Sequence, residues 1–125
     1  MFLVQAFCPL VFAQESGSGL WVSANNSFQV SYESQLKPIV INQIHSWTLH
    51  VSNADGDAIN DAVINVTGGM PEHNHGLATQ PSIEAIGKGS YLLQGLRFHM
   101  MGYWELELDI TQGSISDTVI VTLTL

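Results

Sequence analysis

Apolar and polar residues alternate with a period of two along most of the chain. The clearest run is 104–110, WELELDI, in which four apolar residues alternate with three carboxylates. In an extended strand this spacing places the apolar side chains on one face and the carboxylates on the other. The run 119–125, VIVTLTL, alternates in the same way and is rich in β-branched residues. Both runs predict strands with one face in a core and the other face in water.

Similar short runs recur at regular intervals and are separated by turn-forming residues. Turn signals stand at Lys37-Pro38, Asn53–Gly56, Gly87–Gly89 and Gln112-Gly113. The pattern favours an all-β fold, an immunoglobulin-like antiparallel β-sandwich of seven to eight strands. The predicted strands are 28–32, 39–43, 47–51, 58–67, 82–86, 91–98, 104–110 and 119–125.

A chain of 125 residues is long enough for one domain with a single core. Its first residues, MFLVQAFCPLVFA, are apolar and end in small residues with the spacing of a signal cleavage site, before the sequence turns polar. We therefore expect a secretory signal segment at 1–13, a linker at 14–26 and a single β-sandwich domain at 27–125. The alternative for 1–13 is a first core strand. Cleavage after Ala13 removes Cys8, the one cysteine of the sequence.

Composition narrows the classes of function. Three basic residues face eleven acidic ones, and the net charge of -8 repels nucleic-acid phosphates and anionic lipid surfaces. Apolar runs are too short to span a bilayer, so we expect no membrane span after signal cleavage. The sequence has no Gly-x-Ser-x-Gly, no His-Glu-x-x-His and, once processed, no cysteine nucleophile. These features predict a periplasmic or extracellular protein that is not an enzyme and has no catalytic residues.

Two segments, 68–81 and 98–102, contain most of the histidine and methionine side chains. Both segments lie at predicted strand ends, where β-sandwich proteins place their binding loops. His73 and His75 are two residues apart, so in an extended segment both imidazoles project from one face. The candidate metal ligands are Met70, His73, His75, His99, Met100 and Met101.

The donor types in these segments favour copper. A thioether is a soft, neutral donor that binds Cu(I) well and zinc poorly, whereas imidazole accepts both copper states. Zinc is the competing ion, because three histidines and a carboxylate such as Glu72 could complete a tetrahedral site. The other two histidines are left out of the site. His45 shares the inward parity of Trp47 and is expected at a core edge with a backbone hydrogen bond, and His50 has solvent parity.

The same segments resemble a known family, the YtkA-like domain, which is related to FixH-like proteins. The motifs that carry the resemblance are Met70-Pro71-x-His73-x-His75-Gly76, Gly89-x-Tyr91 and Gly95-Leu96-x-Phe98-x-Met100-x-Gly102-x-Trp104. The resemblance covers roughly residues 58–111. It implies an exported or membrane-tethered immunoglobulin-like sandwich associated with copper handling or with the assembly of copper-containing oxidases. By that match Met70, His73, His75 and Met100 are ligands, whereas the two remaining candidates rest on proximity alone.

The leading hypothesis is an exported copper-binding protein that buffers copper or, like a metallochaperone, exchanges it with a copper-accepting or copper-donating protein. Histidines and methionines on loops suit this task, because a shallow, incompletely coordinated site releases metal faster than an enclosed one. The alternative is a structural or protein-interaction β-sandwich without a metal role. The sequence leaves open whether two chains form a homodimer around one ion.

Overall fold

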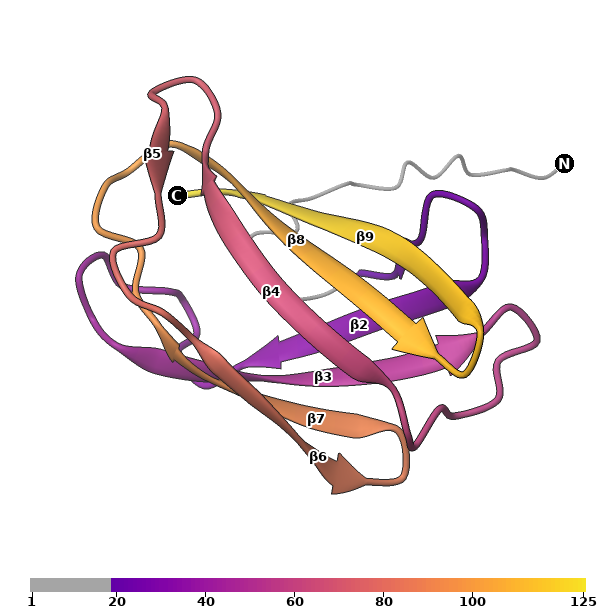
Figure 1. The fold of residues 1–125 in the computed structure, drawn as a ribbon. Coiled ribbons are helices and arrows are strands. Elements are labelled where there is room, and N and C mark those ends of the chain that lie inside the picture. The colour runs from indigo at the N-terminus through magenta and orange to yellow at the C-terminus, as the bar shows by residue number, and fades with distance from the viewer. Residues whose placement is uncertain (1–18) are drawn as a thin grey trace, which may run out of the picture.

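The computed structural model describes residues 19–125, and this part of the chain forms nine β-strands and no helix. The strands are β1 Trp21–Val22, β2 Phe28–Ser34, β3 His45–Asn53, β4 Val63–Met70, β5 His75–Gly76, β6 Ser82–Gly87, β7 Ser90–Leu96, β8 Tyr103–Gln112 and β9 Ile115–Thr124. They form two antiparallel sheets, ordered β1-β2-β3-β7-β6 and β5-β4-β8-β9, which face each other (Figure 1). The predicted all-β antiparallel sandwich is confirmed, although two of its nine strands have only two residues.

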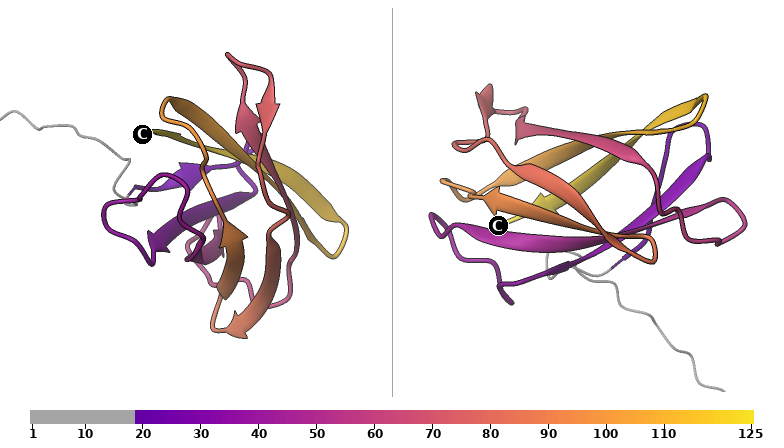
Figure 2. Two further views of the ribbon diagram at one scale, coloured as in Figure 1. Left: turned by 90° about the vertical axis from the view of Figure 1, so that its left-hand side faces the viewer. Right: turned by 60° about the horizontal axis from the view of Figure 1, so that its bottom comes forward.

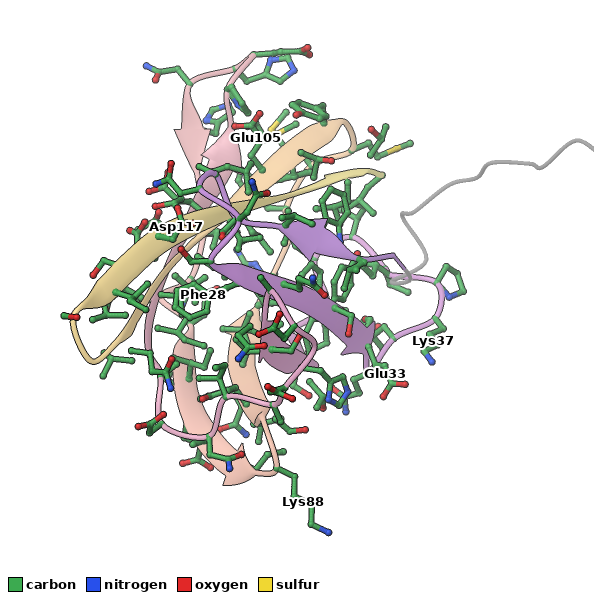
Figure 3. All side chains as sticks on the ribbon, turned by 90° about the vertical axis from the view of Figure 1, so that its right-hand side faces the viewer. Phe28, Glu33, Lys37, Lys88, Glu105 and Asp117 are labelled. Atoms are coloured by element: carbon green, nitrogen blue, oxygen red, sulfur yellow. The ribbon has the colours of Figure 1, made fainter. Side chains whose placement is uncertain are left out.

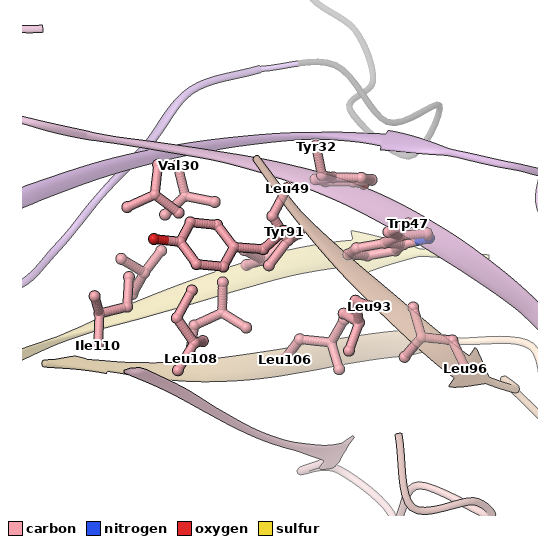
Figure 4. Close-up of a cluster of buried hydrophobic side chains, with 14 of the residues drawn as sticks. Val30, Tyr32, Trp47, Leu49, Tyr91, Leu93, Leu96, Leu106, Leu108 and Ile110 are labelled. Carbon is pink, nitrogen blue, oxygen red and sulfur yellow. The ribbon is translucent and has the colours of Figure 1, made fainter. Parts of the chain in front are cut away.

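The core lies between the sheets and is built from the inward residues of the alternating runs. Leu49 projects from one sheet and Leu106 and Leu108 from the other into this space, and each is at most 1 % exposed (Figure 4). The rings of Tyr32 and Trp47 stack with their centroids 3.8 Å apart. Burying a large apolar side chain stabilises a fold by about 1.5–3 kcal/mol relative to leaving it exposed. The alternation seen in the sequence therefore stabilises the sandwich by placing these apolar side chains in its core.

One end of the sandwich gathers segments that are distant in the sequence. The hairpin of β4 and β5 projects beyond the sheets there, beside the loop between β7 and β8 and the end of β9 (Figures 1 and 2). The last residue of the chain is tied to this end, because Leu125 and Gly102 exchange two backbone hydrogen bonds of 2.9 and 2.8 Å. Both segments predicted to carry metal ligands therefore lie at the same end of the fold.

The sandwich includes residues from 14–26, which were expected to form a linker. In this range Trp21 of β1 pairs with Val30 of β2. The chain that follows is held by Asp117 of β9, whose carboxylate accepts a hydrogen bond of 2.6 Å from Ser23 Oγ. The domain therefore starts before residue 27, because short polar residues here bond to a buried carboxylate, a contact that periodicity does not reveal.

The segment 39–43 was predicted to be a strand and is a turn. Asn42 has a left-handed φ of 69°, a conformation that asparagine adopts more readily than most residues. Its N–H donates to the carbonyl oxygen of Phe98 at 2.8 Å and is not part of a sheet ladder. The prediction was wrong because Ile39 packs against the core from a turn, without strand pairing, while Val40 is exposed.

The strand predicted at 58–67 begins later, at Val63, and extends to Met70. Residues 57–62 cross from one sheet to the other. The hydroxyl of Tyr91 holds this crossing, since it donates to the carbonyl oxygen of Ile59 at 2.7 Å and accepts from the N–H of Ala62 at 3.0 Å. The apolar residues at the start of the predicted strand therefore line a corner.

The predicted signal segment 1–13 and Cys8 lie outside the described residues. Within 19–125 the structure contains no helix with the length and apolar character needed to cross a bilayer.

Candidate metal centre

The first candidate loop is the hairpin between β4 and β5. Pro71 occupies the second position of its turn, and the N–H of His73 donates to the carbonyl oxygen of Met70 at 3.0 Å. Met70 and His75 are directly opposite each other in the antiparallel register, so their side chains lie on the same face of the hairpin. Gly69 permits this pairing, because a Cβ atom at that position would clash with the carbonyl oxygen of His75.

The second candidate loop connects β7 to β8 and carries His99. Its backbone is fixed on both sides of the turn. The indole Nε1 of Trp104 donates to the carbonyl oxygen of Met100 at 3.0 Å. Gly102, with a φ of 131°, is held by its two backbone hydrogen bonds to Leu125. The position of His99 is therefore set by the start of β8 and by the end of β9.

The two loops bring three of the predicted ligands together, His73, His75 and His99, which we call the histidine cluster. The ring centroids of His73 and His75 are 6.2 Å apart. The ring of His75 meets that of His99 edge to face, with centroids 5.7 Å apart. On its other side His99 packs against Trp104 at 5.5 Å. Side chains from two separate turns thus converge within a few ångströms of one another.

The three candidate methionines lie at different depths. Met70 is 1 % exposed and belongs to the core, and Met100 is half-buried against it. Met101 is 71 % exposed. The side chain of Met70 reaches the second loop, since a Cβ atom added at Gly102 would lie 2.7 Å from its Cε. Met70 therefore packs between the two loops, whereas Met101 extends into solvent.

Residues 23–109 match the sequence model of a family described as YtkA-like. The chain belongs to the YtkA-like family. The match includes both candidate loops and extends beyond the resemblance noted in the sequence to take in β2 and β3. No curated protein and no solved structure is significantly similar to the chain.

The histidine cluster of this YtkA-like protein offers donors for a metal without forming a complete cage. Among residues 19–125, no group of three or more histidine, cysteine or acidic side chains is arranged to hold a metal ion. Nδ1 of His99 is buried and has no hydrogen-bond partner among those residues, although buried polar atoms nearly always have one. Imidazole nitrogens beside the thioether of Met70 are donor types that copper accepts in both of its oxidation states.

A hollow of about 380 Å³ lies beside the hairpin on the outer face of the four-stranded sheet. His75, Glu105 and Glu107 are among the residues that line it. The negative charge of Asp109 is the main reason that the pKa of Glu107 is raised, with burial and Glu105 adding to the effect. The hydroxyl of Tyr103 donates to Glu105 at 2.8 Å, and this bond is the main cause of the raised pKa of Tyr103. His75 of the histidine cluster is therefore bordered by carboxylates.

Glu105 and Tyr103 were not among the predicted site residues. The alternation in 104–110 indicates that Glu105 faces solvent, but its place beside the hairpin follows from the pairing of Glu105 with Gly69. This pairing is long-range and leaves no local signal in the sequence. Both lysines of the chain, Lys37 and Lys88, lie away from Glu105 (Figure 3).

The two histidines left out of the predicted site lie elsewhere. His45 is buried at a core edge, where its Nδ1 bonds to the carbonyl oxygen of Gln43 at 3.1 Å and its Nε2 accepts from the indole of Trp47 at 3.2 Å. Burial lowers the pKa of His45 more than the bond to Gln43 raises it. His50 is exposed and bonds to Ser90 at 2.9 Å. The predicted positions of both residues, His45 at a core edge and His50 in solvent, are confirmed.

Proposed function

We propose that this YtkA-like protein is an exported copper-binding protein that buffers copper or delivers it to a partner. The ligands are drawn from the histidine cluster, from Met70 and from Met100, whereas Met101, which is 71 % exposed, is not proposed as a ligand. The single observation that best supports this proposal is the 5.7 Å separation of the rings of His75 and His99, which belong to different loops. The buried, unpartnered Nδ1 of His99 adds support, because an ion or a bound group would satisfy it.

Ligand exchange is the proposed mechanism. His73 and His75 are exposed, so an incoming protein can reach an ion held there and replace the ligands one at a time. Copper is favoured over zinc for the same site. The thioethers beside the imidazoles are poor donors for zinc, and structural zinc sites have four ligands in a closed tetrahedron.

Export to the periplasm or the cell exterior is part of the proposal, as is kinship with FixH-like copper proteins. In an oxidising compartment a thioether is a more durable soft ligand than a free thiol. After residue 13 the sequence has no cysteine and three methionines, all at the candidate loops. We propose no catalytic activity for this site.

Titration of the protein with Cu(I) and with Cu(II), in competition with chromogenic chelators of graded affinity, tests the proposal. Replacing an outer-shell partner of a metal ligand typically weakens binding about 10–100-fold, so we expect His75→Ala, which removes a ligand itself, to cost at least as much. His50→Ala is the matched control, because it removes an exposed imidazole from the surface of β3, away from the loops. We expect it to leave both affinities unchanged.

Two outcomes would overturn the proposal. One is that the protein fails to compete for copper even with a weak chelator. The other is that a His73→Ala, His75→Ala double variant binds copper as tightly as the parent protein. Elemental analysis of the protein recovered from an exported fraction separates copper from zinc, and a preparation that contains stoichiometric zinc would contradict the choice of metal.

A further inference from the structure

The candidate donors form two layers at the end of the sandwich. The imidazoles of His73 and His75 are exposed to solvent and make up the outer layer. The side chain of Met70 lies on the same face of the hairpin as that of His75 but is 1 % exposed. An ion that arrives from solvent therefore meets nitrogen donors first, and the sulfur of Met70 lies beneath them.

The backbone of the second loop covers the inner layer. Gly102 lies so close to Met70 Cε that an added Cβ atom would approach it to 2.7 Å. The turn is secured by the two hydrogen bonds that Gly102 exchanges with Leu125. Because Met70 is 1 % exposed and packs against Gly102, we expect ligation by its sulfur to need a shift of this turn, and the shift has a cost because it strains or breaks these two bonds.

We infer that the outer imidazoles bind copper in either oxidation state and that the Met70 thioether joins only Cu(I), when the turn at Gly102 moves aside. This inference deepens the proposed function and rests on it. The chemical reason is that Cu(I) binds soft thioethers well, whereas imidazole suits both oxidation states. The two states are thus held at different depths, Cu(II) at the surface and Cu(I) partly enclosed.

The decisive comparison is between Met70→Leu and Met101→Leu. Leucine replaces methionine with little change in volume, so the buried variant keeps the core filled. Met101→Leu is the matched control, because it removes an exposed thioether from the same loop that covers Met70. Dissociation constants for Cu(I), measured without oxygen, and for Cu(II) are compared with those of the parent protein.

We expect Met70→Leu to weaken Cu(I) binding by about 10-fold or more, since even the loss of an outer-shell partner typically costs about that much, and to leave Cu(II) binding within about twofold. Met101→Leu should leave both affinities unchanged. Equal weakening of the two states, no weakening of either, or a larger loss in Met101→Leu would overturn the inference. If the parent protein binds neither ion, the proposed function itself fails, so the two failures are distinguishable.

A second measurement does not depend on the folding of a variant. In the parent protein labelled with ¹³C at the methionine methyl groups, Cu(I) should shift the Met70 signal. Without metal, hydrogen peroxide should convert the Met101 thioether to the sulfoxide, with water as the other product, well before it oxidises Met70. An unshifted Met70 signal in the Cu(I) complex, or equal oxidation rates at the two residues, would contradict the two-layer arrangement.

Discussion

Two buried polar groups outside the apolar core differ in whether they have hydrogen-bond partners. Asp117, near the start of β9, is 7 % exposed, and its carboxylate accepts hydrogen bonds from Ser23 Oγ at 2.6 Å and from the N–H of Asn25 at 2.9 Å. His99, in the loop before β8, has a buried Nδ1 without any partner among residues 19–125. The carboxylate of Asp117 is therefore hydrogen-bonded within the fold, whereas Nδ1 of His99 is not.

The difference separates a structural role from the binding role that we propose. Burial alone would raise the pKa of Asp117, but the hydrogen bonds from Ser23 and from neighbouring N–H groups lower it to about 2. Its charged form is therefore stabilised by the folded chain itself. An unpartnered buried nitrogen destabilises the fold unless a ligand or a water satisfies it. Asp117 therefore stabilises the folded chain, whereas Nδ1 of His99 has no hydrogen-bond partner among residues 19–125.

The largest expected effect comes from removing the indole that supports the His99 loop. Trp104→Ala should lower the free energy of unfolding by about 3–5 kcal/mol, because a buried tryptophan leaves a large cavity. It also removes the hydrogen bond to Met100 and the ring contact with His99. Denaturant unfolding measures the change. Trp104→Phe is the control and should lose less; if it loses as much as the alanine variant, the hydrogen bond matters more than the buried area.

The next effect sharpens the contrast at Asp117. Asp117→Asn should lower the melting temperature by several degrees at neutral pH. The amide group replaces one of the two accepting oxygens with an NH₂ group, which cannot accept the hydrogen bonds that Ser23 and Asn25 donate. The folded pKa of about 2 is below the ordinary value of 3.8. The stability that the carboxylate contributes is therefore fully present above about pH 4 and is lost as pH falls towards 2.

Melting curves from pH 7 to pH 2 test this prediction. The difference between parent and variant should shrink across the acid range and be smallest at its lower end. Asp55→Asn, in the exposed turn after β3, changes the net charge by the same amount and should leave the melting temperature unchanged. A constant difference between the Asp117 variant and the parent at all pH values would show that the ionised carboxylate is not the cause.

The smallest effect has the opposite sign. His99→Phe keeps a ring between His75 and Trp104 but removes the unpartnered nitrogen, so we expect the metal-free protein to gain up to about 1 kcal/mol of stability. Copper binding should weaken at the same time. Denaturant unfolding without metal and chelator competition measure the two changes. A clear loss of metal-free stability would show that the nitrogen is already satisfied, and the contrast with Asp117 would disappear.

The sequence predicted the fold well where a single pattern repeats over many residues. The run 104–110 forms the middle of β8, with its apolar side chains buried and its carboxylates on the outer face. In contrast, the shorter pattern at 39–43 gave a strand where the structure has a turn. Short runs fail because a few apolar residues pack equally well as a turn, and the choice depends on partners elsewhere in the chain.

The sequence identified candidate ligands but did not predict their geometry. Histidines and methionines at the ends of predicted strands indicated two candidate binding loops, and the family motif supported that interpretation. The sequence did not show how deeply each side chain is buried. Met70 and Met101 look alike in the sequence, but Met70 is 1 % exposed and Met101 is 71 % exposed. The parity rule applies within strands, and these residues lie at or beyond strand ends.

The sequence by itself determined the period-two alternation, and with it the all-β sandwich and the identity of its core strands, because strand geometry converts that alternation directly into two faces. Only the tertiary structure decided that His75 meets His99, that Met70 lies beneath Gly102 and that Ser23 bonds to Asp117. These contacts join residues far apart in the chain. Their positions depend on sheet pairing and on loop paths, and no local propensity encodes such distances.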